Sequence, residues 1–337
     1  MLGLFIILLL VLCLPFTMKI VERNLEVFLF ICGIMAGLMT GAFNQLTLKA
    51  LLISPLNITL AVFFAGCLFK LFQRNITTTI KTCSRKIPLR LFLALLVILL
   101  GILSSIITAI IAAIVLVTIV KAIHLDRQSE IKFVVIACFS IGMGAVLTPL
   151  GEPLSTIATH KLDEDFFFLF SLLGPTILPS LVFFGAIALV LIRPTNRIST
   201  SSHIAVKESL SDIFIRSCKI YVFVMALTLL GISFEPFIER YLLHLHPFFL
   251  YWLNIISAVL DNATLAAAEI SPRMELPTIR AILLGLLISG GMLIPGNIPN
   301  IIAANQLKIT SKEWARFGLP FGLLLMGFYF IIILLIG

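Results

Sequence analysis

Long apolar runs dominate this sequence and constrain its fold more than any other feature. About 20 apolar residues in succession are enough for a helix to cross the hydrocarbon core of a bilayer. Because 60% of the 337 residues are hydrophobic and only 12% are charged, the chain belongs among polytopic membrane proteins and not among soluble globular domains. The runs lie at about residues 1–16, 25–45, 51–73, 88–123, 131–162, 166–192, 217–234, 247–271, 277–306 and 314–336.

The lengths of the runs indicate where the chain turns within the membrane. Runs 88–123 and 131–162 are longer than a plain span, so each needs a break or a turn. Run 1–16 has neither a basic segment at its start nor a small-residue cleavage site. We therefore expect it to be a retained helix and not a cleaved signal peptide.

Internal similarity predicts a duplication. At an offset of 153 residues, SSIITAIIAA (104–113) aligns with SAVLDNATLAA (257–267), and at an offset of 145, GEPLSTIATHKL (151–162) aligns with GNIPNIIAANQL (296–307). Each unit then ends in an apolar helix with an early Gly and Pro. This order of polar-tipped hairpin, Gly/Pro-broken helix and closing helix is typical of a duplicated transporter.

The distribution of basic residues predicts the topology. If 90–121 and 247–271 are hairpins that return to the side from which they start, the 24 Lys and Arg divide 19 to 5 between the two sides. The richer side is then cytoplasmic, both termini are extracytoplasmic, and the two repeats are inverted. Hairpins at 131–162 and 277–306 would give 18 to 6, so charge does not choose between these assignments.

Three acidic residues lie well inside apolar runs: Glu152, Asp261 and Glu269. A carboxylate in lipid is costly, so each is expected to face the protein interior or a water-filled cavity on an ion pathway. Asp261-Asn262 interrupts the apolar pattern and predicts the tip of a re-entrant hairpin that holds a cation. The alternative is a single kinked helix in which Asp261 pairs with a neighbour.

Glu152 lies in TPLGEPLST, a predicted break in a helix. Pro149 and Pro153 remove backbone donors and Gly151 permits unusual dihedrals, so carbonyls are freed at the break. Carbonyl, hydroxyl and carboxylate oxygens are the ligands that hard cations prefer. A plain proline kink, with Glu152 satisfied by a helix N-terminus, is the alternative.

The matching break, IPGNIPN, carries amides in place of the carboxylate. One predicted cation site combines Glu152 with the tip of the first hairpin, and a second combines Asp261 with Asn297 and Asn300. Glu269 follows eight residues after Asp261 and is either a proton relay or a partner of Arg273 or Arg280 near the membrane surface.

The motifs GAVLTPLGEPLSTIA, SAVLDNATLAAAEI and GGMLIPGNIPNIIAA resemble the ion transporter superfamily over about residues 88–336. Within it, the chain is most similar to an uncharacterised prokaryotic family of proposed cation transporters. More distantly, it is similar to sodium/proton antiporters of the arsenite/dicarboxylate-transporter type. The resemblance implies two re-entrant hairpins, here 90–121 and 247–271, and two broken helices that together form the transport site, often moving elevator-fashion within a dimer.

The resemblance also implies a set of binding residues, carried over by motif. They are Ser104, Ser105, Thr108, Gly151, Glu152, Ser155, Ser257, Asp261, Asn262, Asn297 and Asn300. The first hairpin tip departs from the family pattern because it lacks the usual Asn or Asp, which puts the first ion site in doubt. The scaffold also has fewer helices before the second hairpin than in larger relatives.

We therefore expect an all-α polytopic membrane protein with about 8 transmembrane helices, two of them broken, plus two re-entrant hairpins in an inverted repeat. Residues 1–87 would form N-terminal scaffold helices, 88–192 the first repeat, 193–216 a cytoplasmic linker, and 217–336 the second repeat, which begins with a scaffold helix. The expected setting is the plasma membrane, and the expected partners are the lipid bilayer and a second copy of the chain. The charge of +8 is attributed to topology and not to nucleic-acid binding.

The expected function is secondary transport that exchanges sodium for protons, because both can compete for one buried carboxylate. No cofactor is expected beyond these transported ions. The alternative is sodium-coupled symport of a small organic or inorganic anion. An intramembrane aspartyl protease needs two aspartates, and Asp261 is the only one in an apolar run, so no enzyme is expected. A membrane scaffold that does not transport would tolerate Asp261→Asn and Glu152→Gln.

Overall fold

A computed structural model describes residues 2–18, 20–21, 24–45, short pieces between 48 and 71, 88–123, 125–192, 209–241, 245–258 and 262–336. Within these ranges every regular element is a helix. Four helices there are long and apolar enough to cross a membrane: Leu89–Ile107, Arg127–Ala145, Phe168–Leu191 and Ser311–Leu335. The prediction of a multi-pass helical membrane protein is confirmed at this level.

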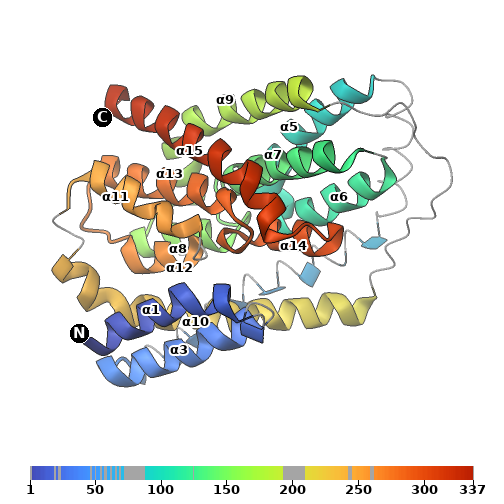
Figure 1. The fold of residues 1–337 in the computed structure, drawn as a ribbon. Coiled ribbons are helices and arrows are strands. Elements are labelled where there is room, and N and C mark those ends of the chain that lie inside the picture. The colour runs from blue at the N-terminus through green and yellow to red at the C-terminus, as the bar shows by residue number, and fades with distance from the viewer. Residues whose placement is uncertain are drawn as a thin grey trace.

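The N-terminal helices pack beside a helix from the middle of the chain. α1 (Leu2–Thr17) lies against α3 (Leu25–Thr40), and α3 lies along α10 (Leu210–Tyr241), so the three form the lower layer of Figure 1. α10 also packs against α12 and so joins this layer to the rest of the molecule.

The first predicted hairpin consists of two helices that meet at one residue. α5 (Leu89–Ile107) ends and α6 (Ala109–Ala122) begins on either side of Thr108, whose φ of 75° and ψ of 149° interrupt the helix. The Thr108 hydroxyl accepts the backbone N–H of Ile111 at 3.4 Å and caps α6. In Figure 1, α5 enters from the right-hand side, and α6 packs against it and returns to that side.

Two helices are broken where the sequence carries Gly and Pro. α7 (Arg127–Ala145) is followed, after an irregular stretch, by α8 (Pro153–Leu162). α13 (Leu276–Met292) is followed by the short helix η2 (Ile294–Gly296) and by α14 (Ile298–Leu307). Both second halves begin with Pro in the first turn, where a missing N–H has no cost.

The second predicted hairpin also folds back. Its incoming arm is α11 (Pro247–Leu253) with η1 (Asn254–Ala258), and its outgoing arm is α12 (Asn262–Glu269). The Asn254 and Glu269 side chains lie next to each other across the arms. A continuous helix would separate residues 15 positions apart by about 22 Å, so this closeness favours a hairpin over a single kinked helix. Asp261 itself lies outside the described residues.

Equivalent features recur at the offsets found in the sequence. α8 and α14 are ten residues each and begin 145 residues apart, and α9 (Phe168–Leu191) and α15 (Ser311–Ile336) end 145 residues apart. Ser104 donates its hydroxyl to the Ile141 carbonyl at 2.9 Å, and Ser257 donates to the Leu286 carbonyl at 3.3 Å. The two donors are 153 residues apart and the two acceptors 145.

The core lies where α7 packs between α5, α9 and α13. Contact there is close enough to require glycine, since a Cβ on Gly144 would lie 1.7 Å from the Gly101 carbonyl oxygen. Ser140 of α7 donates to the Val97 carbonyl of α5 at 2.8 Å, and Phe139 is 1% exposed. α7 is thus held on all sides, and the break that follows it is anchored.

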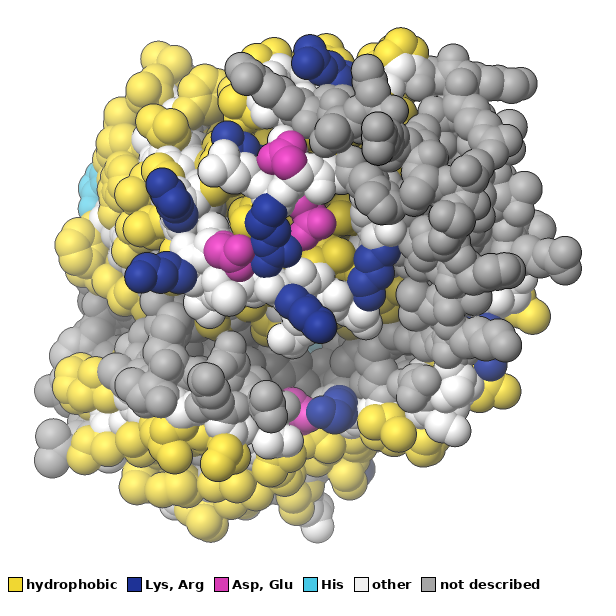
Figure 2. Space-filling model, turned by 45° about the vertical axis from the view of Figure 1, so that its right-hand side comes forward, with side chains coloured by type: hydrophobic (Ala, Val, Ile, Leu, Met, Phe, Trp, Pro, Cys, Tyr) yellow, Lys and Arg dark blue, Asp and Glu magenta, His cyan; other side chains and the backbone are white. Residues whose placement is uncertain are grey.

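One face of the molecule gathers charged side chains (Figure 2). The neighbouring ends of α6, α7, α14 and α15 and the turns beside them carry several basic residues: Lys121, Arg127, Lys308, Lys312 and Arg316. The start of α1 and the end of α15 lie at the opposite side in Figure 1.

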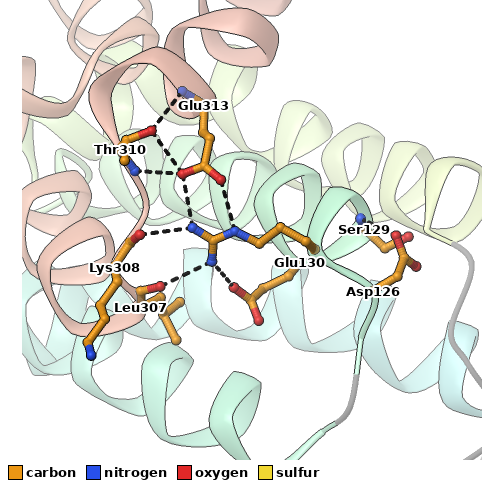
Figure 3. Close-up of polar contacts among 8 residues, drawn as sticks. Asp126, Ser129, Glu130, Leu307, Lys308, Thr310 and Glu313 are labelled. Atoms are coloured by element: carbon orange, nitrogen blue, oxygen red, sulfur yellow. Dashed lines mark hydrogen bonds and ion pairs between the residues drawn. The ribbon is translucent and has the colours of Figure 1, made fainter.

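Arg127 ties the start of α7 to the end of α14 on this face (Figure 3). Its guanidinium donates two hydrogen bonds to the Glu313 carboxylate, at 3.0 and 2.9 Å, and one to Glu130 at 2.7 Å. It also donates to the carbonyls of Leu307 and Lys308, which the end of α14 leaves without helical partners. One side chain thus links both broken helices and α15.

Candidate functional site

A small pocket lies where the first hairpin tip meets both helix breaks. Its cavity volume is about 20 Å³. Four of the predicted binding residues line it: Thr108, Gly151, Glu152 and Asn297. The remaining lining residues are Ala109, Ile110, Leu150, Pro153, Thr156 and Ile298. Residues nearly 200 positions apart in sequence therefore share one cavity.

The first hairpin tip is bonded directly to the first break. The backbone N–H of Ala109, the first residue of α6, donates to the Gly151 carbonyl at 2.8 Å. Thr148 donates its hydroxyl to the Ser105 carbonyl, which adds a second link between the same two segments. Gly151 is required here because a Cβ would lie 1.8 Å from the Ala145 carbonyl oxygen.

Glu152 brings a carboxylate to the pocket and is only 6% exposed. It is the N-cap residue of α8, with an extended backbone at φ −154° and ψ 162°. Ser155 donates its hydroxyl to the Glu152 carbonyl at 2.7 Å, so that serine supports the break and does not line the cavity. The N-terminus of α8 favours negative charge at this position.

Asn297 is the equivalent N-cap residue of α14, with φ −151° and ψ 145°. Its side chain lies against Gly142 of α7, where a Cβ would come within 2.6 Å of the Asn297 amide nitrogen. The second break therefore reaches across to the first broken helix, and the cavity has a carboxylate on one wall and an amide on the other.

The second break contains a further buried acceptor. Asn300 donates its amide to the carbonyls of Gly290 and Leu293, both at 2.9 Å, while its Oδ1 is buried without a hydrogen-bond partner. Asn262, at the start of α12, is 2% exposed, and its Nδ2 is also buried without a partner. Unpaired buried polar atoms are uncommon in folded proteins, and each needs an explanation.

Other predicted binding residues have structural partners instead. Ser104 is fully buried and donates to the Gly101 and Ile141 carbonyls, and Ser105 donates to the Ile102 carbonyl. Ser257 bonds the Leu286 carbonyl. The Ser104 and Ser257 hydroxyls join one helix to another, the Ser105 hydroxyl bonds within α5, and none of the three residues lines the pocket. The sequence pattern did not tell which of the hydroxyls in these segments face the pocket.

Glu269 is buried in the second hairpin, at 4% exposure, and its partner Asn254 is fully buried. Among the described residues no Lys or Arg forms an ion pair with Glu269, so the interpretation that paired it with Arg273 or Arg280 gains no support. Asn254 was missed by the sequence analysis. Its signal was an amide inside the apolar run of the second hairpin.

The pocket offers oxygen ligands of the kind that alkali and alkaline-earth ions take. Within the described part of the chain there is no cluster of three or more His, Cys, Asp or Glu that could hold a metal ion. The chemistry on offer is a carboxylate, a hydroxyl and backbone carbonyls around a small cavity.

Comparison with known proteins leaves the activity open. No curated protein matches this chain. A family model matches it over residues 1–336. The chain belongs to that family, described as "Protein of unknown function (DUF1646)".

Proposed function

We propose that this protein is a secondary active transporter of the plasma membrane that exchanges sodium for protons. The observation that carries the proposal is the pocket at which Thr108, Glu152 and Asn297 converge. It joins the first hairpin tip and the two helix breaks, the segments in which freed backbone carbonyls are tolerated at membrane depth because they line a cavity.

The size of the pocket favours an ion over an organic substrate. A cavity needs about 10–15 Å³ to hold one water molecule, and this one measures about 20 Å³. A single small cation with little hydration fits that volume, whereas a dicarboxylate does not. The sodium-coupled anion symporter is therefore the second choice.

The charge of the pocket favours a cation that competes with a proton. The Glu152 carboxylate gives the cavity a formal negative charge, and a bound cation stabilises its ionised form. Removing the cation leaves a buried carboxylate that gains from protonation. Binding of one ion thus displaces the other, which is the exchange that antiport requires.

A second cation site is proposed beside the second break. The unpartnered Oδ1 of Asn300 is an acceptor available to a cation, and Asn262 lies next to Asp261 in sequence. Asp261 would supply the charge there.

The architecture that we propose is an inverted repeat with two re-entrant hairpins and about 8 crossings, assembled as a homodimer with both termini extracytoplasmic. The recurrence of helix ends and serine hydrogen bonds at the same offsets supports the repeat. The clustered basic face supports the orientation.

Purified protein in proteoliposomes tests the proposal. Proton flux driven by sodium, lithium or potassium is measured for wild type, Glu152→Gln and Asp261→Asn, with Asp165→Asn in an exposed turn as the matched control. We expect sodium-driven proton flux in wild type and the control, and its loss in both site variants. Unchanged flux in both site variants removes the site assignment, and uptake of an organic anion without cation-driven proton flux replaces antiport.

A further inference from the structure

The second hairpin holds a polar pair that the proposed ion sites do not use. Glu269 and Asn254 lie next to each other across the two arms, and their side chains are 4% and 0% exposed. Oε2 of Glu269 and Oδ1 of Asn254 are both buried without a hydrogen-bond partner. The Asn254 amide nitrogen also donates to the Ile282 carbonyl of α13 at 3.3 Å, which fixes the side chain against α13.

Two buried acceptors without hydrogen-bond partners are unfavourable. A buried carboxylate without a counter-charge loses its hydration at a large cost, and a buried amide oxygen without a donor adds a smaller cost. A single proton on Oε2 of Glu269 relieves both, because the resulting O–H can donate to Oδ1 of Asn254. Carboxylic acid and amide then form a cyclic pair with a donor and an acceptor on each side.

Among the described residues, the neighbouring charged side chains do not supply Glu269 with a counter-charge. α12 packs against α8, α10, α13 and η1. The described ionisable side chains on these elements are His160 and Lys161 of α8, Cys218, Lys219 and Tyr221 of α10, and Arg280 of α13. Lys219 pairs with Glu26, and the Lys161 ammonium donates to the Ile270 carbonyl at 3.3 Å. None forms an ion pair with Glu269 within the described residues.

The pair lies near an exposed turn in the sequence. Glu269 ends α12, and the chain reaches exposed Pro272 and Arg273 only three residues later. At the offset of 153 residues, the first hairpin carries Gly101 and Leu116 in place of Asn254 and Glu269. The first hairpin therefore lacks an equivalent polar pair.

We propose that Glu269 and Asn254 form a proton-binding site that latches the two arms of the second hairpin together. The protonated acid closes the latch by donating to Asn254. Loss of that proton leaves two acceptors without a donor between them, which repel and release the arms. The site binds a proton apart from the cation pocket, and its role in transport rests on the proposed antiport function.

Infrared difference spectroscopy in lipid tests the site without any transport. Glu269→Gln preserves the shape and lets an amide donate to Asn254, Asn254→Leu removes the acceptor, and Glu275→Gln at an exposed position is the control. We expect a protonated carboxyl band near neutral pH that is lost in Glu269→Gln, shifted in Asn254→Leu and unchanged in Glu275→Gln. A band that persists unchanged in Glu269→Gln overturns the site.

A transport measurement then tests the coupling. Glu269→Gln, fixed in the latched state, is expected to lose the pH dependence of sodium-driven proton flux, while Glu275→Gln retains it. Wild-type pH dependence in Glu269→Gln overturns the coupling. If wild type shows no cation-driven proton flux, the antiport proposal fails, and the infrared result still decides the proton site by itself.

Discussion

Ala109 donates its backbone N–H to the carbonyl oxygen of Gly151 at 2.8 Å, which fastens the tip of the first hairpin to the break in the first broken helix. The bond lies at the wall of the pocket that also contains Glu152. Each of the two segments has backbone groups without helical partners, and each supplies a hydrogen-bond partner to the other. The cavity between them therefore keeps a fixed shape.

This close approach predicts that Gly151→Ala is destabilising. The new Cβ would lie 1.8 Å from the Ala145 carbonyl oxygen, so the backbone must move. Overpacking of this kind costs about 1–3 kcal/mol, and we expect a lower midpoint of thermal unfolding in detergent. Gly327→Ala is the matched control because no atom lies within 4 Å of the new Cβ. Equal midpoints for both variants would show that the break tolerates a Cβ.

Glu152 and Asn297 are N-cap residues of equivalent helices and line the same cavity. A negative charge moved from position 152 to position 297 should therefore still contribute to sodium binding. Glu152→Gln is expected to weaken sodium binding by about 10–100-fold, because a hydrogen bond or ligand contact to a charged group is worth about 1.5–3 kcal/mol. Adding Asn297→Asp to that variant should recover part of the affinity.

Calorimetric titration of the purified variants with sodium measures this recovery of affinity. Gln128→Glu on the Glu152→Gln background is the control, because Gln128 is exposed and does not line the pocket. Equal recovery from both second substitutions would mean that net charge, and not the pocket, sets the affinity.

The Arg127–Glu313 pair should couple weakly and in a salt-dependent way. The side chains are 43% and 33% exposed, and exposed pairs contribute about 0.2–1 kcal/mol. A double-mutant cycle with Arg127→Lys and Glu313→Gln, followed by thermal unfolding, is expected to give a coupling in that range that decreases as salt rises. A coupling energy that does not change with salt concentration would argue against an electrostatic origin of the Arg127–Glu313 interaction.

Asp126 should make the start of α7 sensitive to acid. Its carboxylate accepts the backbone N–H of Ser129 at 3.0 Å, and this hydrogen bond lowers the pKa of Asp126 in the folded protein. A pKa that is lower in the folded state stabilises the fold at pH values above the ordinary aspartate pKa, and that contribution is lost as pH falls through the lowered value.

Asp126→Asn keeps the cap and removes the titration. We expect the two proteins to have similar unfolding midpoints at neutral pH, with the wild type losing more stability below about pH 4. Parallel midpoints across the acid range would contradict the prediction.

The positions of the helix breaks could be predicted from the sequence because they are local. Thr148 to Thr156 and Ile294 to Asn300 carry Pro and Gly, and these residues act on the backbone wherever the segment lies. The offset of 145 residues found by alignment reappears in the bounds of α8 and α14.

The role of each polar side chain could not be predicted in this way. Ser104 and Thr108 belong to the same motif, yet Ser104 bonds a carbonyl of α7 and Thr108 lines the cavity. The direction in which each hydroxyl points depends on the helix that packs against its segment, and that helix is distant in sequence.

The sequence by itself determined that the chain is a helical membrane protein, where two of its helices break and that Glu152 and Glu269 are buried, because hydrophobicity and backbone restriction are properties of short segments. Only the tertiary structure decided that Glu152 and Asn297 share one small cavity and that Asn254 meets Glu269 across the hairpin. Such meetings depend on chain reversals and on the packing of distant helices, which no local pattern encodes.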